Sequence, residues 1–330
     1  MSPSRLSQKP RVVCLGTPKH AGADYLESFG KDFDFEVLEA TSRAETQLKL
    51  PELISKGGPI DAFIIRMGTP PYEPFDKDLL EALVPDCRII TSASAGYNEF
   101  DVEWMSKSNV IFCNSVDAVA EATADMAMFL TLAVLRNTSN AERIAKSGKW
   151  RGEPGVLIPA RDPTNLTLGI VGMGSIGKYL AKKAAVFNMK IRYYNRRQLP
   201  KDVEKEYNAT YCDSLHELLS HTNELAAMKD GAFLINTARG AVVDEAALKV
   251  ALKSGKVARA GLDVLVNEPN VDPWFFEQDN VIVQPHLGGL TDVAFQKAER
   301  ECFENIRAYF ETGKANSPVN LDQLKGSSKI

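Results

Sequence analysis

One glycine-rich segment constrains the fold of this chain more than any other feature. Residues 168–178 read Leu-Gly-Ile-Val-Gly-Met-Gly-Ser-Ile-Gly-Lys, an apolar run that enters a GxGxxG pattern and continues into a helical stretch. Gly172 permits a tight turn, Gly174 lets the backbone approach a pyrophosphate, and Gly177 lets helix and strand pack closely. The free N–H groups at the start of such a helix attract phosphate. The segment predicts a parallel α/β domain that binds a dinucleotide through Gly172, Gly174, Ser175, Ile176 and Gly177.

The next predicted strand, over Ile191–Asn195, indicates which dinucleotide binds. It ends about where an acidic residue usually holds the adenosine ribose, but this chain has Asn195, followed by Arg196 and Arg197. Without a carboxylate, a 2′-phosphate is not repelled, and a guanidinium can bind it through two hydrogen bonds. The segment therefore favours NADP(H). In the alternative, the arginines are solvated surface charges and Asn195 bonds the hydroxyls of NAD(H).

Short apolar strands alternate with helical stretches along the chain, which is typical of parallel α/β proteins. The strands expected in a first series are Arg11–Leu15, Phe35–Leu38, Ala62–Arg66, Arg88–Ser92 and Val110–Phe112. Those expected in a second series are Thr167–Val171, Ile191–Asn195, Ala232–Thr237, Ala260–Val264 and Val281–Gln284. An amphipathic helix over Asp292–Glu311 is expected to return to the first domain. We therefore expect two Rossmann-like parallel-sheet domains, with residues 121–290 inserted into a flavodoxin-like domain of residues 1–120 and 291–330.

Composition narrows the partners that we expect. A net charge of −4 disfavours nucleic acid, which needs a concentrated basic face. The most apolar helical stretch, Met126–Leu135, is too short to span a membrane and is expected to be buried. The five cysteines are scattered without a CxxC pair, so we expect no metal site and a cytoplasmic location. Ser328-Lys329-Ile330 differs by one conservative change from a peroxisomal tripeptide, so a peroxisomal location stays open.

Three polar side chains follow successive strands of the second series. Arg239 follows one strand, Glu268 the next and His286 the last. Since the carboxyl ends of parallel strands share one edge of a sheet, these side chains are expected to converge beside the dinucleotide. A cation can hold a carboxylate and polarise a carbonyl, and histidine, with an unperturbed pKa of about 6.5, can donate a proton near neutral pH. Each residue alone has an ordinary structural explanation, but together they predict reduction of a 2-oxo acid.

The same segments, in the same order, resemble the D-isomer-specific 2-hydroxyacid dehydrogenases over nearly the whole chain. The matching motifs are GxGxxG, Asn-Thr-Ala-Arg-Gly at 236–240, Asp263 with Glu268-Pro269, and Pro-His-Leu-Gly-Gly at 285–289. Residues 150–165 and the Asn-Arg-Arg ending are most similar to fungal glyoxylate/hydroxypyruvate reductases and D-mandelate dehydrogenases.

That resemblance implies a substrate, a set of contacts and an assembly. The substrate would be glyoxylate, hydroxypyruvate or an aromatic 2-oxo acid, with its carboxylate held by the backbone of Ala95 and Gly96 in the first domain. Homodimers are typical of the family. Met67, Tyr72, Tyr97 and Trp274 either shape the substrate pocket or serve as packing. Further cofactor contacts are implied at Thr123, Thr237, Ala238, Asp263, Gly288 and Gly289.

The chain departs from the family pattern between Ser220 and Glu224. Family members continue there into a strand and a Cys-Pro-Leu-like loop, whereas this chain passes directly into Glu-Leu-Ala-Ala-Met-Lys. In the usual strand order the missing strand lies beside the glycine-loop strand, so we expect a cofactor sheet short of one central strand. The cause is open between a gene-model or splice error, a natural inactive isoform, and a sheet adapted by a shift of Ala232–Thr237. The alternative function is therefore a catalytically impaired dinucleotide-binding isoform or a corepressor-like binding protein.

Overall fold

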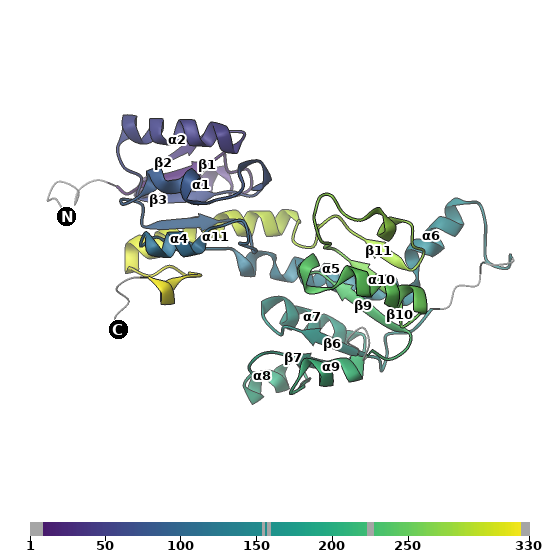
Figure 1. Ribbon diagram of the computed structural model, residues 1–330. Helices are drawn as coiled ribbons and strands as arrows, with labels where there is room; N and C mark the ends of the chain where they lie inside the picture. Colours follow the sequence, from purple (N-terminus) through teal and green to yellow (C-terminus); the bar gives the residue numbers. More distant parts are fainter. Residues whose placement is uncertain (1–8, 154–155, 157–159, 223–227, 325–330) are drawn as a thin grey trace. The chain divides into compact units, whose positions relative to one another are not determined.

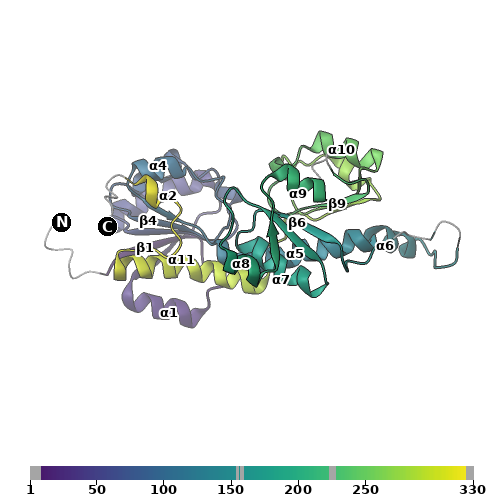
Figure 2. The same cartoon turned by 90° about the horizontal axis from the view of Figure 1, so that it is seen from below.

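The chain divides into two compact units. The computed structural model describes residues 9–324 except 154–155, 157–159 and 223–227, so Ser328-Lys329-Ile330 lies outside the described residues. Unit 1 comprises Met1–Val119 with Thr291–Ile330, and unit 2 comprises Ala120–Leu290. Figures 1 and 2 show their elements from two directions.

Unit 1 is a five-stranded parallel sheet in the order β2-β1-β3-β4-β5. Its inner strands are buried on both faces, because Val13 and Leu15 of β1 pack on one side while Val12 and Cys14 pack on the other. The strands are β1 (Arg11–Leu15), β2 (Asp34–Leu38), β3 (Ala62–Ile65), β4 (Ile89–Ser92) and β5 (Ile111–Cys113). The helices are α1 (Ala23–Asp32), α2 (Arg43–Gly57), α3 (Lys77–Leu80), α4 (Val102–Lys107) and α11 (Asp292–Thr312).

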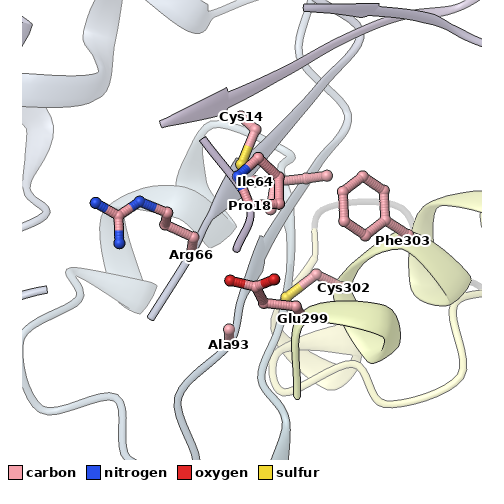
Figure 3. Close-up of a pocket in the computed structure, with 8 residues that line it drawn as sticks. All are labelled: Cys14, Pro18, Ile64, Arg66, Ala93, Glu299, Cys302 and Phe303. Atoms are coloured by element: carbon pink, nitrogen blue, oxygen red, sulfur yellow. The ribbon is translucent and has the colours of Figure 1, made fainter. Parts of the chain in front are cut away.

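The C-terminal helix α11 belongs to the core of unit 1, where Cys302, Phe303 and Ile306 pack on the same face of the sheet as Val12. Figure 3 shows a small space between β1, β3 and α11 that has no room for a water molecule. The Glu299 carboxylate beside it is 2% exposed and accepts the backbone N–H groups of His20 at 2.6 Å and Ala21 at 2.8 Å. This carboxylate therefore ties the turn after β1 to α11.

Unit 2 contains two separate three-stranded sheets, in the orders β6-β7-β8 and β11-β10-β9. Every strand pair in both sheets is parallel. Within the residues that the structure describes, no strand lies between β6 and β9, in agreement with the expected gap in the cofactor sheet. An adapted sheet would need the strand predicted over Ala232–Thr237 to move beside the glycine-loop strand. Among the described strands it pairs with β10 alone, so this shift is not observed. The strands are β6 (Thr167–Val171), β7 (Lys190–Tyr194), β8 (Ala209–Tyr211), β9 (Ala232–Asn236), β10 (Val257–Leu262) and β11 (Val281–Val283).

The strands on either side of the missing strand are less buried than a central strand of unit 1. All five residues of β1, a central strand with two neighbours, are buried, whereas only Ile170 of β6 and only Asn236 of β9 are buried. Val171 of β6 is 63% exposed, an unusual value for an apolar residue in an inner strand of a parallel sheet. The residues of β6 and β9 are therefore less buried than those of a central strand in unit 1.

One long helix, α5 (Val116–Arg136), packs against both half-sheets of unit 2. Met128 belongs to the apolar cluster of Ile170 on β6, while Leu130 and Val134 belong to the cluster beneath β9. By length and composition this helix could cross a membrane, but 67% of its apolar window is buried within the protein, as expected for a core helix. The other helices are α6 (Thr138–Lys146), α7 (Ser175–Val186), α8 (Lys201–Glu206), α9 (Leu215–Thr222) and α10 (Glu245–Ser254).

Candidate active site

The glycine loop has the backbone geometry that its sequence predicts. Gly172 has a φ of 96°, which L side chains rarely adopt, and Gly174 precedes the first turn of α7. A Cβ on Gly177 would lie 2.4 Å from the Gly172 carbonyl oxygen, so this glycine allows the close approach of helix and turn. A Cβ on Gly174 would meet nothing within 4 Å, which leaves space in front of the helix N-terminus. Ser175 and Ile176 form the first residues of that helix.

A cavity of about 860 Å³ opens in front of this loop. Its lining comprises Val171, Gly172, Met173, Gly174, Lys178, Tyr194, Asn195, Arg196, Arg197 and Leu199. The Asn195 side-chain oxygen accepts the Met173 N–H at 2.7 Å, so its amide group is oriented by the glycine loop. Arg196 and Arg197 are exposed beside it. This volume, the helix N-terminus and the neighbouring cations fit a nicotinamide dinucleotide.

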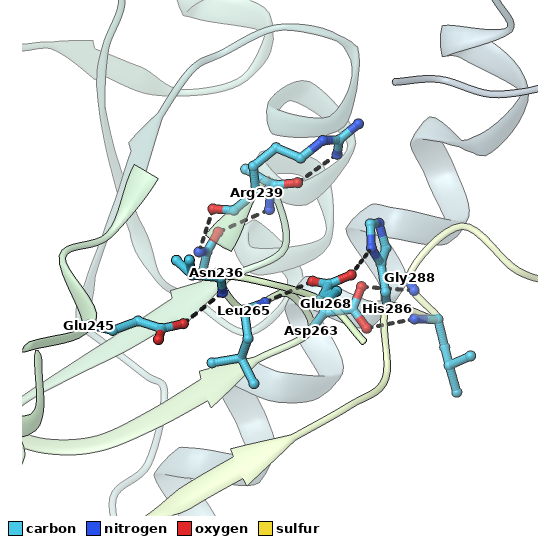
Figure 4. Close-up of polar contacts among 11 residues, drawn as sticks. Asn236, Arg239, Glu245, Asp263, Leu265, Glu268, His286 and Gly288 are labelled. Atoms are coloured by element: carbon cyan, nitrogen blue, oxygen red, sulfur yellow. Dashed lines mark hydrogen bonds and ion pairs between the residues drawn. The ribbon is translucent and has the colours of Figure 1, made fainter. Parts of the chain in front are cut away.

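His286 and Glu268 are in direct contact in unit 2. The Nδ1 atom of His286 lies 2.7 Å from Oε2 of Glu268, and Oε1 of Glu268 accepts the Leu265 N–H at 2.8 Å (Figure 4). The backbone bond aims the carboxylate, and the carboxylate in turn orients the imidazole. With a proton on Nδ1, the Nε2 atom remains for exchange with a ligand. The two side chains are 49% and 33% exposed, so that atom can reach a ligand in solvent.

Asp263 holds the segment that carries His286. Its carboxylate, 2% exposed, accepts the N–H groups of Leu287 at 2.8 Å and Gly288 at 2.9 Å. Its carbonyl oxygen accepts the N–H of His286 at 2.8 Å, and His286 itself has a φ of 56° in the left-handed region. A Cβ on Gly288 would lie 2.6 Å from the Asp263 carboxylate and 3.5 Å from Thr123. Thr123, Asp263 and Gly288 are thus neighbours, and Gly289 follows in the same loop.

Arg239 lies in a tight turn after β9, where Thr237 and Ala238 precede it. The Asn236 side chain fixes this turn, because it accepts the Ala238 N–H at 3.0 Å and donates to the Arg239 carbonyl at 2.9 Å. The guanidinium is exposed and donates to the Ala238 carbonyl at 2.7 Å, whereas Glu268 and His286 bond each other (Figure 4). The structure therefore brings the acid and the histidine together, and it shows Arg239 bonded within its own turn.

Two residues that sequence reasoning did not single out support this site. Asn236 was visible only as part of the Asn-Thr-Ala-Arg-Gly stretch, and its burial reveals its role in the turn. Glu245, at the start of α10, accepts the Val266 N–H at 2.7 Å and so steadies the loop that leads to Glu268. Gly240 shows how closely these loops pack, since a Cβ there would lie 2.1 Å from the backbone of Leu265.

The loop predicted to hold a carboxylate lies in unit 1 after β4. Asn114 donates to the Ala95 carbonyl at 2.6 Å, and the Ser94 hydroxyl donates to the Gly96 carbonyl at 2.9 Å. These bonds engage carbonyl groups, so neither of them uses the N–H of Ala95 or Gly96. The geometry is compatible with those two N–H groups binding an anion.

Two of the aromatic residues considered for the pocket serve as packing. Tyr72 is buried in the core of unit 1, where its hydroxyl donates to the Ala40 carbonyl at 2.9 Å. Trp274 packs edge-on against Phe275 beside α10. Met67 packs partly buried against the core of unit 1, whereas Tyr97 is exposed on the carboxylate loop. Throughout the described chain, no cluster of three His, Cys, Asp or Glu side chains is arranged to hold a metal ion.

Comparison with known proteins identifies similar chains. The family model for the NAD binding domain of D-isomer specific 2-hydroxyacid dehydrogenases matches residues 128–223 and 221–288, in two pieces that meet at 221–223. A dehydrogenase of Hormonema carpetanum, efuE, is 54% identical over 347 aligned positions that include 99% of this chain and 86% of the relative. Because this chain has only 330 residues, at least 17 of those positions have no counterpart in it.

Solved structures extend the comparison to the fold. A glyoxylate reductase from Paecilomyes thermophila superposes with a TM-score of 0.84 at 32% identity, covering 94% of this chain and 98% of the other. The apo D-mandelate dehydrogenase of Rhodotorula graminis gives the same TM-score and identity, with coverage of 94% and 97%. The likeness spans both units.

Proposed function

The chain belongs to the D-isomer-specific 2-hydroxyacid dehydrogenase family, and from that premise we propose that it reduces a small 2-oxo acid to the D-2-hydroxy acid with NADPH. The observation that supports this most directly is the pair formed by His286 and Glu268. Both follow strands of the unit that also contains the glycine loop.

Each residue has a distinct role in the proposed reaction. The reduced nicotinamide, when bound, supplies the hydride that adds to C2 of the oxo acid. His286 gives the Nε2 proton to the carbonyl oxygen as its C=O double bond becomes a single bond. Glu268 accepts the Nδ1 proton in a hydrogen bond, which fixes the tautomer and stabilises the imidazolium before transfer. Arg239 binds the substrate carboxylate and polarises the carbonyl, and the N–H groups of Ala95 and Gly96 hold the same carboxylate.

Residues around the cavity support NADPH as the preferred cofactor. The Asn195 oxygen already accepts the Met173 N–H, so its amide NH₂ can donate to a ribose or phosphate oxygen. Arg196 and Arg197 follow directly, and none of the described residues that line the cavity carries a carboxylate. Thr123, Thr237, Ala238, Asp263, Gly288 and Gly289 are proposed as the remaining contacts of the dinucleotide.

Oxidation of NADPH by purified protein with glyoxylate, hydroxypyruvate and phenylglyoxylate tests this proposal. We expect turnover with at least one acid and its loss in His286→Ala. The control is His216→Ala, which changes an exposed histidine on α9 outside the site. A folded protein that binds NADPH yet oxidises none with any of these acids would contradict the enzyme function. That outcome would favour the alternative, a dinucleotide-binding protein with impaired catalysis, for which the divided sheet is the specific observation.

We further propose a homodimer in the cytoplasm. Light scattering of the purified chain tests the first point, and microscopy of a tagged chain tests the second. A tag on the N-terminus leaves Ser328-Lys329-Ile330 free, so import into peroxisomes would be visible in the same experiment.

A further inference from the structure

The cofactor loop, defined as residues 195–199, joins β7 to α8 and carries Arg196 and Arg197. All of its residues except Gln198 line the cavity in front of the glycine loop. Both arginines are exposed, so the bonds at the two ends of the loop decide the backbone conformation from which their side chains extend. Recognition of a 2′-phosphate therefore depends on how those ends are held.

The first end of the loop is tied to the glycine loop and to β8. The side-chain oxygen of Asn195 accepts the Met173 N–H at 2.7 Å, and its carbonyl oxygen accepts the Tyr211 hydroxyl at 3.3 Å. Gly172 donates its N–H to the Tyr194 carbonyl at 3.0 Å, which extends the bonding between β6 and β7 to the start of the loop. Asn195 is therefore held through both its side chain and its backbone.

The second end of the loop is tied to a tyrosine and a carboxylate that are both buried. Leu199 donates its N–H to the Tyr193 hydroxyl at 3.0 Å, and that hydroxyl donates to Oε1 of Glu204 at 2.8 Å. The same Oε1 atom accepts the Gln198 amide at 2.7 Å, while Oε2 accepts the Lys201 ammonium at 2.8 Å. Tyr193 is 0% exposed and Glu204 is 9% exposed, so solvent hardly competes for these bonds.

The protonation states of this pair fix the direction of its hydrogen bonds. Bonds from Lys201, Gln198 and Tyr193 lower the pKa of Glu204 to about 2, so at neutral pH its carboxylate is ionised and can only accept. Burial raises the pKa of Tyr193 to about 12, so its hydroxyl keeps the proton that it donates. The network is therefore satisfied within the protein, and its effect is to restrain the loop.

We propose that Glu204 and Tyr193 are positioning residues that hold the cofactor loop so that Arg196 and Arg197 meet the 2′-phosphate of NADPH. Neither Glu204 nor Tyr193 lines the cavity, so both act through the loop. A loop that is already ordered loses less conformational freedom on binding, which favours the ligand that uses its side chains. The inference rests on the proposed preference for NADPH and adds which residues create that preference.

Substitution of Glu204 separates positioning from a simple effect of charge. Glu204→Gln removes a negative charge close to the loop, and charge alone would strengthen binding of a 2′-phosphate or leave it unchanged. The substitution also replaces one acceptor by an NH₂ group that faces a donor, so at least one bond of the network is lost. Loss of positioning would weaken binding of the 2′-phosphate, which is the opposite sign.

Calorimetry with 2′,5′-ADP and 5′-AMP measures the contribution of the 2′-phosphate without substrate or turnover. We expect the parent to bind 2′,5′-ADP more tightly than 5′-AMP. Glu204→Gln and Tyr193→Phe are each expected to raise the Kd of 2′,5′-ADP by about threefold to tenfold and that of 5′-AMP by less than about twofold.

The matched control is Glu206→Gln, which removes the same charge from the same helix. The Glu206 carboxylate pairs with Lys182 at 3.2 Å and forms no bond with residues 195–199, all of which the structure describes. We expect this variant to keep the Kd of 2′,5′-ADP or to lower it. Tyr193→Phe removes one hydroxyl and no charge, so it decides the test if the melting curve of Glu204→Gln shows an unfolded protein.

The outcomes separate this inference from the proposed function. A parent that binds both nucleotides equally would contradict the preference for NADPH, and this inference with it. A parent that prefers 2′,5′-ADP and variants that keep the full preference would overturn this inference alone. Equal weakening of both nucleotides would overturn it as well, since Glu204 and Tyr193 would then only stabilise the fold. Absence of turnover does not affect these measurements, so failure of the proposed reaction stays distinguishable.

Discussion

Replacement of Asp263 by asparagine tests how the loop that carries His286 is held. The buried carboxylate accepts two backbone N–H groups, from Leu287 and Gly288, one on each oxygen. Asparagine keeps one acceptor and turns an NH₂ toward the other N–H group, so one hydrogen bond to a charged group is lost. Loss of such a bond costs about 1.5–3 kcal/mol.

This loss has a measurable size. In a unit of this length, 1 kcal/mol shifts the melting temperature by about 2–4 °C, so Asp263→Asn is expected to lower it by about 3–12 °C. The loop shift also moves His286, whose N–H is bonded to the Asp263 carbonyl. On the proposed function we expect kcat to fall by about tenfold to a hundredfold, since misplacement of a catalytic group by about 1 Å is enough.

The assay combines a thermal melt with NADPH oxidation, and Asp244→Asn is the matched control. Asp244 also accepts a backbone N–H, that of Ala247 at 3.0 Å, but it does so as the N-cap of α10. Asparagine caps helices as well as aspartate does, so this variant is expected to melt within about 2 °C of the parent. If Asp263→Asn also melted within that range, the bonds to Leu287 and Gly288 would not hold the loop.

Three further predictions follow from other contacts. Glu268→Gln is expected to lower kcat by about tenfold to a hundredfold, because a neutral amide stabilises the His286 imidazolium poorly. The melting temperature is expected to stay unchanged. A kcat–pH profile identical to that of the parent would contradict this role. Arg197→Ala is expected to raise the KM for NADPH by about tenfold to a hundredfold, because a charge-assisted hydrogen bond to the 2′-phosphate is lost. The KM for NADH is expected to stay nearly unchanged. Equal effects on both KM values would show that Arg197 is a surface charge without a role in cofactor choice. Hydrogen bonds from Lys201, Gln198 and Tyr193 lower the pKa of Glu204 to about 2, so this carboxylate stabilises the fold above about pH 4.5 and the stabilisation is lost as pH falls toward about 2. Melts of Glu204→Gln across that range should therefore show a weaker dependence on pH than the parent.

Much of the parallel architecture could be predicted, because apolar runs of β-branched residues between helical segments are strong local signals. Two of the ten predicted strands, Arg11–Leu15 and Thr167–Val171, match the observed strands, and the other eight differ from them at one or both ends by one to three residues. The strand β8 was missed since Ala209–Tyr211 is short and only Ala209 within it is buried. The helix expected behind the glycine loop begins at Ser175, because Gly174 serves as its N-cap.

The ends of the long helix after the first series of strands could not be predicted from the local sequence pattern. Sequence analysis singled out only its most apolar stretch, Met126–Leu135, whereas the helix spans Val116–Arg136 and α6 follows after Asn137. Asn137 has a φ of 54°, a left-handed conformation that asparagine tolerates better than most residues. The family resemblance was predicted from motif order and spacing and is confirmed. The missing central strand was predicted in the same way, and the described residues agree with it, since none of their strands pairs with both β6 and β9.

The chemical groups of the candidate site could be predicted from the sequence, whereas most of the hydrogen bonds that hold its loops could not. Glu268 and His286 could be paired because they follow neighbouring strands, and the structure places them in contact. The bonds from Asn236 and Glu245 could not be foreseen, since they depend on which loop backbone lies within reach. Whether Arg239 reaches the substrate stays a prediction.

The division of unit 2 has a consequence for how the chain folds. Each half-sheet is built from one continuous stretch of sequence, β6 to β8 from Thr167 to Tyr211 and β9 to β11 from Ala232 to Val283. In the part of the chain that the structure describes, no ladder of hydrogen bonds joins them, and their coupling rests on α5 and its apolar side chains. Each half can therefore open while the other stays formed, as separate cooperative units do. Unit 2 is therefore expected to unfold as two cooperative units.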